Sequence, residues 1–130
     1  MPHTLLTRTY LILSAAAFAW IGLKTMLNPQ LALAGLELLP TSPTGLNEIR
    51  ANYGMMHVAF ATVILLGLRG GDYLRTALVL NIAVAGGLVL GRLSSMALDG
   101  MPNTVALVLL GIEVVSVLCA TLVWRVACKA

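Results

Sequence analysis

The sequence of 130 residues contains few charged residues, and this scarcity already limits the kind of protein that it encodes. Only 10% of the residues are charged, whereas 59% are hydrophobic. A soluble domain is about half apolar and about a quarter charged. Because the apolar residues exceed what a soluble core needs, we expect much of the surface to face lipid.

Cysteine and the common cofactor motifs are also scarce. The two cysteines, Cys119 and Cys128, lie nine residues apart on one expected helix, so they cannot pair with each other. We interpret both as small apolar side chains. Zinc and haem-attachment spacings, glycine-rich phosphate loops and nucleophile elbows are all absent. The sequence therefore names no cofactor, and it leaves open whether the protein is an enzyme.

Four stretches are long and apolar enough to cross a membrane, which takes roughly 20 residues. They cover Thr9–Leu27, Glu48–Leu68, Leu74–Leu98 and Thr104–Val126. Their continuous apolar runs favour helices, because the strands of a membrane barrel alternate over about 10 residues. The sequence predicts an all-α integral membrane protein, a single domain over 1–130, built as a four-transmembrane-helix bundle.

The first stretch also has the features of a signal peptide. Arg8 precedes the apolar run LILSAAAFA, in which Ala17-Phe18-Ala19 is a candidate cleavage site. We expect this stretch to be retained as the first membrane helix.

The segment between the first two helices is amphipathic. Its leucines are expected to lie at the membrane interface in a short helix that Pro40 and Pro43 end. Thr44 or Asn47 is then the expected cap of the second helix.

Basic residues gather on one side of the membrane. That side carries Arg8, Arg69, Arg75, Arg125 and Lys129, against the single acid Asp72. The positive-inside rule places this side, with both termini, in the cytoplasm, and we expect the cytoplasmic (inner) membrane of a bacterium. The net charge of +3 thus needs no nucleic-acid partner, because the basic residues flank membrane spans.

Polar residues nevertheless occur inside the apolar helices, and they share faces and depths. Asn47, Arg50, Gly54 and His57 follow one stripe of the second helix. At about 1.5 Å per residue, His57 of this stripe, Arg92 of the third helix and Glu113 of the fourth reach similar depths. A charge that faces lipid costs several kcal/mol, so Glu113 is expected to have a partner, with Arg92 the first candidate.

Two interpretations of these residues stay open. In one, Arg92 and Glu113 form a structural staple, and the other polar residues make interhelical hydrogen bonds. In the other, the helices enclose a polar mid-membrane pocket that binds or transforms a small apolar molecule, with Glu113, His57 and Arg92 as candidate acid, base or anchor. The residues expected to line that pocket are Asn47, Arg50, Tyr53, Gly54, His57, Asn81, Arg92, Ser95 and Glu113.

Several of these residues have simpler explanations. His57 is more often a hydrogen-bonded core residue than a metal ligand, although axial ligation of haem is an alternative. Tyr53 is also explained as an aromatic residue at the membrane interface. Gly87 and Gly91 form a GxxxG spacing that permits close packing with another helix. The alternative function is that of a non-enzymatic accessory or structural subunit. Such a subunit would use this face to form a homo-oligomer or to join a larger membrane complex.

The motifs NEIRANYG, GRLSSMALDGMP and the single glutamate of the fourth helix resemble a bacterial family of small four-helix membrane proteins of unknown function. The resemblance covers most of the chain and implies the same fold, but it implies no reaction. Members often have a second glycine where Met55 stands and do not reliably have His57. A weaker likeness, an Arg-Ala pair and a Gly-Met-Met run, is to styrene oxide isomerase, which uses haem held by histidine; the simplest alignment places Asn52 at that histidine.

Overall fold

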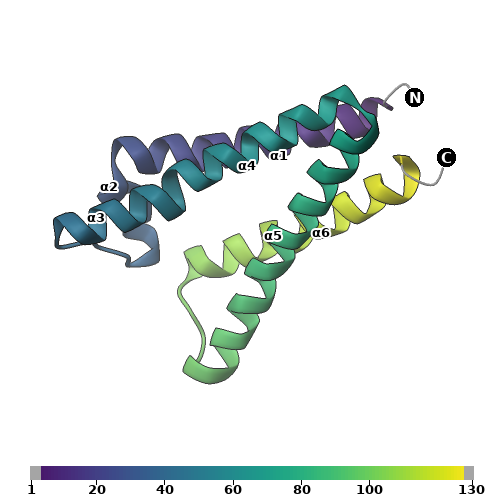
Figure 1. Cartoon of the computed structure of the whole chain (residues 1–130). Helices are drawn as coiled ribbons and strands as arrows, with labels where there is room; N and C mark the ends of the chain where they lie inside the picture. Colours follow the sequence, from purple (N-terminus) through teal and green to yellow (C-terminus); the bar gives the residue numbers. More distant parts are fainter. Residues whose placement is uncertain (1–3, 128–130) are drawn as a thin grey trace.

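The computed structural model describes residues 4–127, and nearly all of them are helical (Figure 1). Cys128 and Lys129 lie outside the described residues. The elements in chain order are α1 (Leu5–Leu27), α2 (Pro29–Leu33), the 3-10 turn η1 (Ala34–Leu36), α3 (Pro43–Ile49), the π-helix η2 (Arg50–Met55), α4 (Met56–Leu66), the 3-10 turn η3 (Gly67–Arg69), α5 (Gly71–Asp99) and α6 (Thr104–Ala127). The predicted all-α fold is confirmed.

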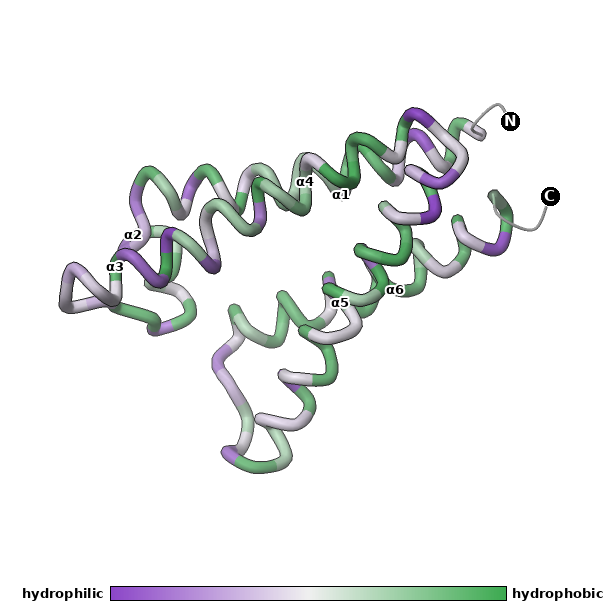
Figure 2. The backbone as a smooth tube through the Cα atoms, in the orientation of Figure 1, coloured by the Kyte–Doolittle hydropathy of each residue, from purple (hydrophilic) through white to green (hydrophobic). Residues whose placement is uncertain are grey.

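Four helical runs are long and apolar enough to cross a membrane. They are α1, the continuous run from α3 to η3 (Pro43–Arg69), α5 and α6. Figure 2 shows hydrophobic residues along all four runs, with the hydrophilic residues concentrated near the helix ends. The chain is therefore a multi-pass membrane protein whose exposed apolar side chains contact lipid.

The second run begins five residues earlier than the sequence predicted, at Pro43 rather than Glu48. The expected caps, Thr44 and Asn47, are wrong, because the Oγ of Ser42 accepts a hydrogen bond from Gly45 N at 3.1 Å. Pro43 occupies the first helical turn, where its missing N–H would have had no partner and its fixed φ suits the helix. The proline thus starts this helix.

Glycine at both ends of α5 sets where this long helix starts and stops. Gly70 precedes it with φ 84° and Gly100 follows it with φ 94°. Positive φ at these values strains any residue that carries a Cβ. The two glycines allow the chain to reverse direction tightly on either side of α5.

The helices associate as two antiparallel pairs, α1 with α4 and α5 with α6 (Figure 1). The pairs meet at the end of the bundle that carries η3, the start of α1 and the end of α6, which we call the terminal end. Towards the opposite end, which carries 28–42 and 100–103 and which we call the loop end, α5 turns away from α1 and α4, while the start of α6 stays beside η1. The buried core lies near the terminal end and comprises Leu11, Ala15, Ala61, Ile64, Leu74, Ala77, Leu78 and Val123. Van der Waals packing within this core holds the two pairs together.

One polar contact links the two pairs at the loop end. The Nδ2 of Asn103, just before α6, donates to Gly35 O at 3.0 Å and to Glu37 Oε1 at 3.1 Å. Glu37 itself has a left-handed φ of 60°, which is uncommon for a residue with a side chain. The contact with Asn103 stabilises this turn and attaches the loop to α6.

Within the first pair, the backbones of α1 and η2 touch at two glycines. A Cβ added at Gly22 would lie 2.7 Å from Gly54 O and 2.8 Å from Val58 Cγ2. A Cβ added at Gly54 would lie 2.7 Å from Met26 Sδ. Close approach to the backbone therefore requires glycine at Gly22, whereas at Gly54 the neighbour is the flexible side chain of Met26.

We predict that Gly22→Ala lowers the free energy of unfolding by about 1–3 kcal/mol, because the added methyl group meets the rigid backbone of η2. The measurement is SDS-induced unfolding in mixed micelles. Gly86→Ala is the matched control, since an added Cβ there meets nothing within 4 Å. Equal stability of the two variants would contradict the close contact.

Candidate functional site

The motif that opens the second membrane span forms a π-helix. Residues Arg50–Met55 (RANYGM) adopt this wider turn between α3 and α4. π-Helical turns are rare and occur frequently at functional sites, because the wider turn redirects side chains and frees backbone carbonyls. The single stripe predicted from regular α-helical spacing is therefore interrupted: Asn47 is exposed, Arg50 and His57 are half-buried, and Gly54 is buried.

Arg50 is oriented by the end of α1. Its Nε donates a hydrogen bond to Met26 O at 3.2 Å, which satisfies a carbonyl in the last turn of that helix. Within residues 4–127, no carboxylate lies within ion-pair distance of Arg50, and neither Nη atom has a hydrogen-bond partner. The guanidinium group thus keeps donors that the protein itself does not use.

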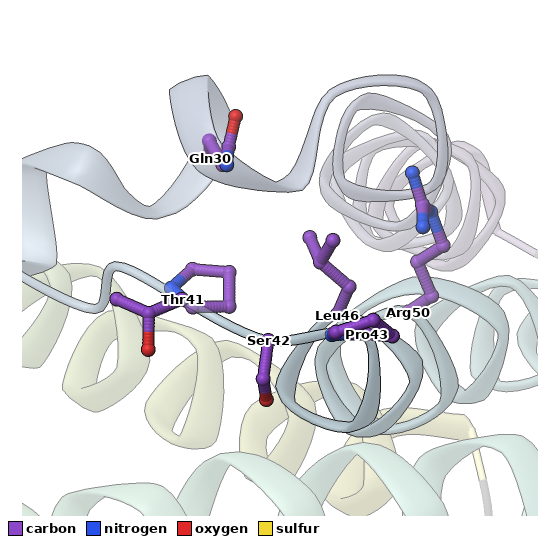
Figure 3. Close-up of a pocket in the computed structure, with 7 residues that line it drawn as sticks. Gln30, Thr41, Ser42, Pro43, Leu46 and Arg50 are labelled. Carbon is purple, nitrogen blue, oxygen red and sulfur yellow. The ribbon is translucent and has the colours of Figure 1, made fainter.

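Arg50 also lines a pocket at the loop end, between α2 and α3 (Figure 3). The pocket is a widely open hollow with a volume of about 580 Å³. Its lining residues are Gln30, Pro40, Thr41, Ser42, Pro43, Leu46 and Arg50. Of the residues that the sequence predicted to line a pocket, Arg50 alone takes part in this one.

His57 lies among aromatic rings at the start of α4. The ring centroids of Phe18, Phe60 and Tyr53 lie 5.8, 6.1 and 6.3 Å from that of His57, and the Tyr53 ring is stacked at 15°. The Nδ1 of His57 faces Asn52 O at 3.3 Å, a carbonyl of the π-helix. When Nδ1–H donates to this carbonyl, Nε2 carries the lone pair and is the atom available to a ligand or a proton.

Arg92 and Glu113 form the ion pair that the sequence predicted. The Arg92 Nε lies 2.8 Å from Glu113 Oε2, and Nη2 donates to Oε1 at 3.0 Å. This two-point geometry is the strongest form of an arginine–carboxylate contact. The side chains keep 24% and 11% of their surface exposed, so the pair is accessible although it lies within two apolar helices.

Asn81 and Ser95 have partners of their own. Asn81 is fully buried and exchanges hydrogen bonds with Ser14 of α1, at 2.8 and 3.0 Å. Ser95 is exposed and donates to Asp99 one turn later, at 3.1 Å. Asn81 therefore connects the two helix pairs, and Ser95 makes a local bond near the end of α5.

The residues predicted to form one cluster thus make two sets of contacts. Arg50, Gly54 and His57 contact α1 or their own helix, whereas Arg92 contacts Glu113 between α5 and α6. Within residues 4–127, no hydrogen bond or ion pair joins Arg50 or His57 to the Arg92–Glu113 pair. In the same part of the chain, no group of three His, Cys, Asp or Glu side chains is placed to hold a metal ion.

Two features were missed from the sequence. Gly22, which lets η2 approach α1, was not singled out, although a glycine within an apolar helix is a signal of close packing. The pocket residues Gln30, Thr41 and Ser42 had no signal beyond loop composition. Ser42 followed by Pro43 is, however, a recognisable start of a helix, and it would have placed the boundary correctly.

We predict that Arg92→Gln and Glu113→Gln each destabilise the protein and that the double variant is less unstable than their sum. Each single change leaves the other charge without its partner, so a double-mutant cycle should give a coupling energy of roughly 0.5–3 kcal/mol. The measurement is SDS-induced unfolding of all four proteins. Asp72 and Arg75, both exposed at the terminal end, form the control cycle, expected below about 0.5 kcal/mol.

Comparison with known proteins gives a family and no activity. No curated protein and no solved structure matches the chain. A family model described as "Domain of unknown function (DUF4345)" matches residues 6–124, which include all four membrane spans apart from their extreme ends. The predicted resemblance to a family of unknown function is confirmed, and the chain belongs to the DUF4345 family.

Proposed function

We propose that the protein binds or transforms a small, largely apolar molecule in the loop-end half of its bundle, where Arg50, His57, Arg92 and Glu113 recognise its polar group. The observation that carries the proposal is the Arg92–Glu113 ion pair, which remains partly exposed between two apolar helices. Charged groups inside membrane spans are costly, and for that reason they commonly mark functional positions.

The distribution of the core supports this location. The buried cluster lies near the terminal end, and α5 turns away from α1 and α4 towards the loop end (Figure 1). The polar residues named above all lie beyond the core, on the side of the loop end. A molecule dissolved in lipid would reach them laterally, between the pairs, without crossing the loops.

The available atoms suit a carbonyl or anionic group. Arg92 uses Nε and Nη2 for Glu113, and its Nη1 has no hydrogen-bond partner among the described residues. In the catalytic form of the proposal, Glu113 and the Nε2 of His57 exchange a proton with the bound molecule. In the binding form, the same groups orient it.

We further propose that the terminal end faces the cytoplasm of a bacterium and that the membrane is the inner one. Arg8, Arg69, Arg75 and Arg125 lie near the terminal end, together with the acid Asp72. The excess of arginine supports this orientation by the positive-inside rule.

The test is native mass spectrometry of the protein extracted in mild detergent, with an absorption spectrum of the same sample. We expect a reproducible adduct on the wild-type protein and its loss from Glu113→Gln, because the amide no longer accepts a proton or pairs with Arg92. Asp72→Asn, an equally small change at the terminal end, should keep the adduct. A folded Glu113→Gln protein with undiminished adduct would overturn the proposal, and a haem-like absorption band would identify the bound molecule as haem.

The alternative function is that of a non-enzymatic subunit, in a homo-oligomer or a larger membrane complex. Gly87 and Gly91 favour it, because both are exposed on α5 and a Cβ added at either meets nothing within 4 Å. No described residue packs closely against these two glycines, so a second helix could approach α5 there at short distance.

Under this alternative, Gly87→Leu should release the partner, because the larger side chain holds the helices apart. The measurement is the mass of the complex by native electrophoresis in mild detergent. Gly111→Leu on α6, which is equally unobstructed, is the control. A wild-type protein that runs as a monomer and co-purifies with nothing would contradict the alternative.

A further inference from the structure

The pocket at the loop end has the composition of a headgroup site. Its seven lining residues comprise one cation (Arg50), three neutral hydrogen-bonding residues (Gln30, Thr41 and Ser42) and three apolar residues (Pro40, Pro43 and Leu46) (Figure 3). No carboxylate lines it. A ligand that fits this wall carries negative charge at one end and tolerates apolar contact beside it.

The geometry of the Arg50 guanidinium group suits the binding of an oxyanion. The bond from its Nε to Met26 O fixes the plane of the guanidinium group. Both Nη atoms have no partner among the described residues, which leaves donors in the planar arrangement that suits phosphate or carboxylate. A merely structural arginine at this position would be expected to satisfy these donors within the protein or lie fully in solvent, but Arg50 is half-buried at the pocket.

The surroundings of the pocket place it at a membrane surface. The loop that forms one wall exposes Leu31, Leu38 and Leu39, by 66%, 40% and 64%. Exposed leucines beside neutral polar residues are typical of a segment that lies at the level of the lipid headgroups. A molecule in the pocket would therefore have its charged end at Arg50 and its apolar part among these leucines.

We propose that this pocket binds the phosphate or carboxylate head of an anionic amphiphile, with Arg50 as the anchoring residue. The site shares Arg50 with the function proposed above but does not use the Arg92–Glu113 pair, so Glu113→Gln, which should abolish the adduct proposed there, should leave lipid binding at this pocket unchanged. Gln30, Thr41 and Ser42 supply hydrogen bonds to the rest of the head.

The experiment titrates the full-length protein in dodecyl maltoside with dioleoyl phosphatidylglycerol or dioleoyl phosphatidylcholine and follows the adducts by native mass spectrometry. The two lipids share their tails and differ in net charge. We expect the wild type to prefer phosphatidylglycerol, and Arg50→Gln to weaken that binding about tenfold or more, because charge-assisted hydrogen bonds are lost. Glutamine keeps an N–H donor for Met26 O, which favours retention of the fold.

Arg75→Gln is the matched control, because Arg75 is an exposed arginine near the terminal end. It should bind phosphatidylglycerol as the wild type does. Equal binding by Arg50→Gln and the wild type, or equal loss in Arg75→Gln, would overturn the proposal. If Arg50→Gln fails to fold, the test is amide hydrogen exchange of residues 40–46 in the wild-type protein. Phosphatidylglycerol should slow their exchange more than phosphatidylcholine does. Equal protection by the two lipids would contradict the proposed site.

A second arm distinguishes a lipid from a free anion. Inorganic phosphate is added to the protein with bound phosphatidylglycerol, at concentrations up to those that saturate a weak anion site. If phosphate displaces the lipid only from the protein that retains Arg50, the pocket is an oxyanion site that a soluble anion can occupy. If the lipid stays bound, the occupant is the amphiphile. Displacement that is equal in Arg50→Gln and the wild type would reflect ionic strength alone and would contradict the site.

Discussion

The contact between the backbones of α1 and η2 is the constraint on which the first half of the molecule depends. Gly22 and Gly54 carry no side chain at the point where the two helices approach, and a Cβ at Gly22 would collide with Gly54 O. Because the helices approach so closely there, Arg50 reaches the carbonyl of Met26 one turn beyond. The same approach brings Phe18 of α1 beside the ring of His57. The positions of Arg50 and His57 therefore depend on the close approach of the two helices at Gly22.

The second half of the molecule depends on a different kind of contact. Between α5 and α6 the described chain has the ion pair of Arg92 and Glu113, and closer to the terminal end a hydrogen bond joins Asn81 to Ser14. Apolar side chains that face lipid gain nothing from helix association by the hydrophobic effect, so polar contacts of this kind decide which helices pair. The partial exposure of the ion pair distinguishes it from a fully buried staple, and it is why this pair supports a proposal of function.

The divergence of α5 from α1 and α4 connects these two halves to the proposed function. The core joins all four spans near the terminal end, and Asn103 attaches the loop to α6 at the loop end. The region between them has polar residues from α4, α5 and α6 and little core packing. The bundle is therefore densely packed near the terminal end and less densely packed between that core and the loop end.

The sequence by itself determined the number of spans, their helical class and the pairing of Arg92 with Glu113. These follow from local composition and from depth along a helix, because each residue advances the same distance and a charge in an apolar span needs a partner. Tertiary structure alone decided the rest. The π-helix at Arg50–Met55 was not evident from regular helical spacing, and Asn47, which that spacing placed on the stripe, is exposed. The pocket at Arg50 brings Gln30 of α2 together with 40–46, segments whose proximity depends on the path of the loop and not on any local pattern.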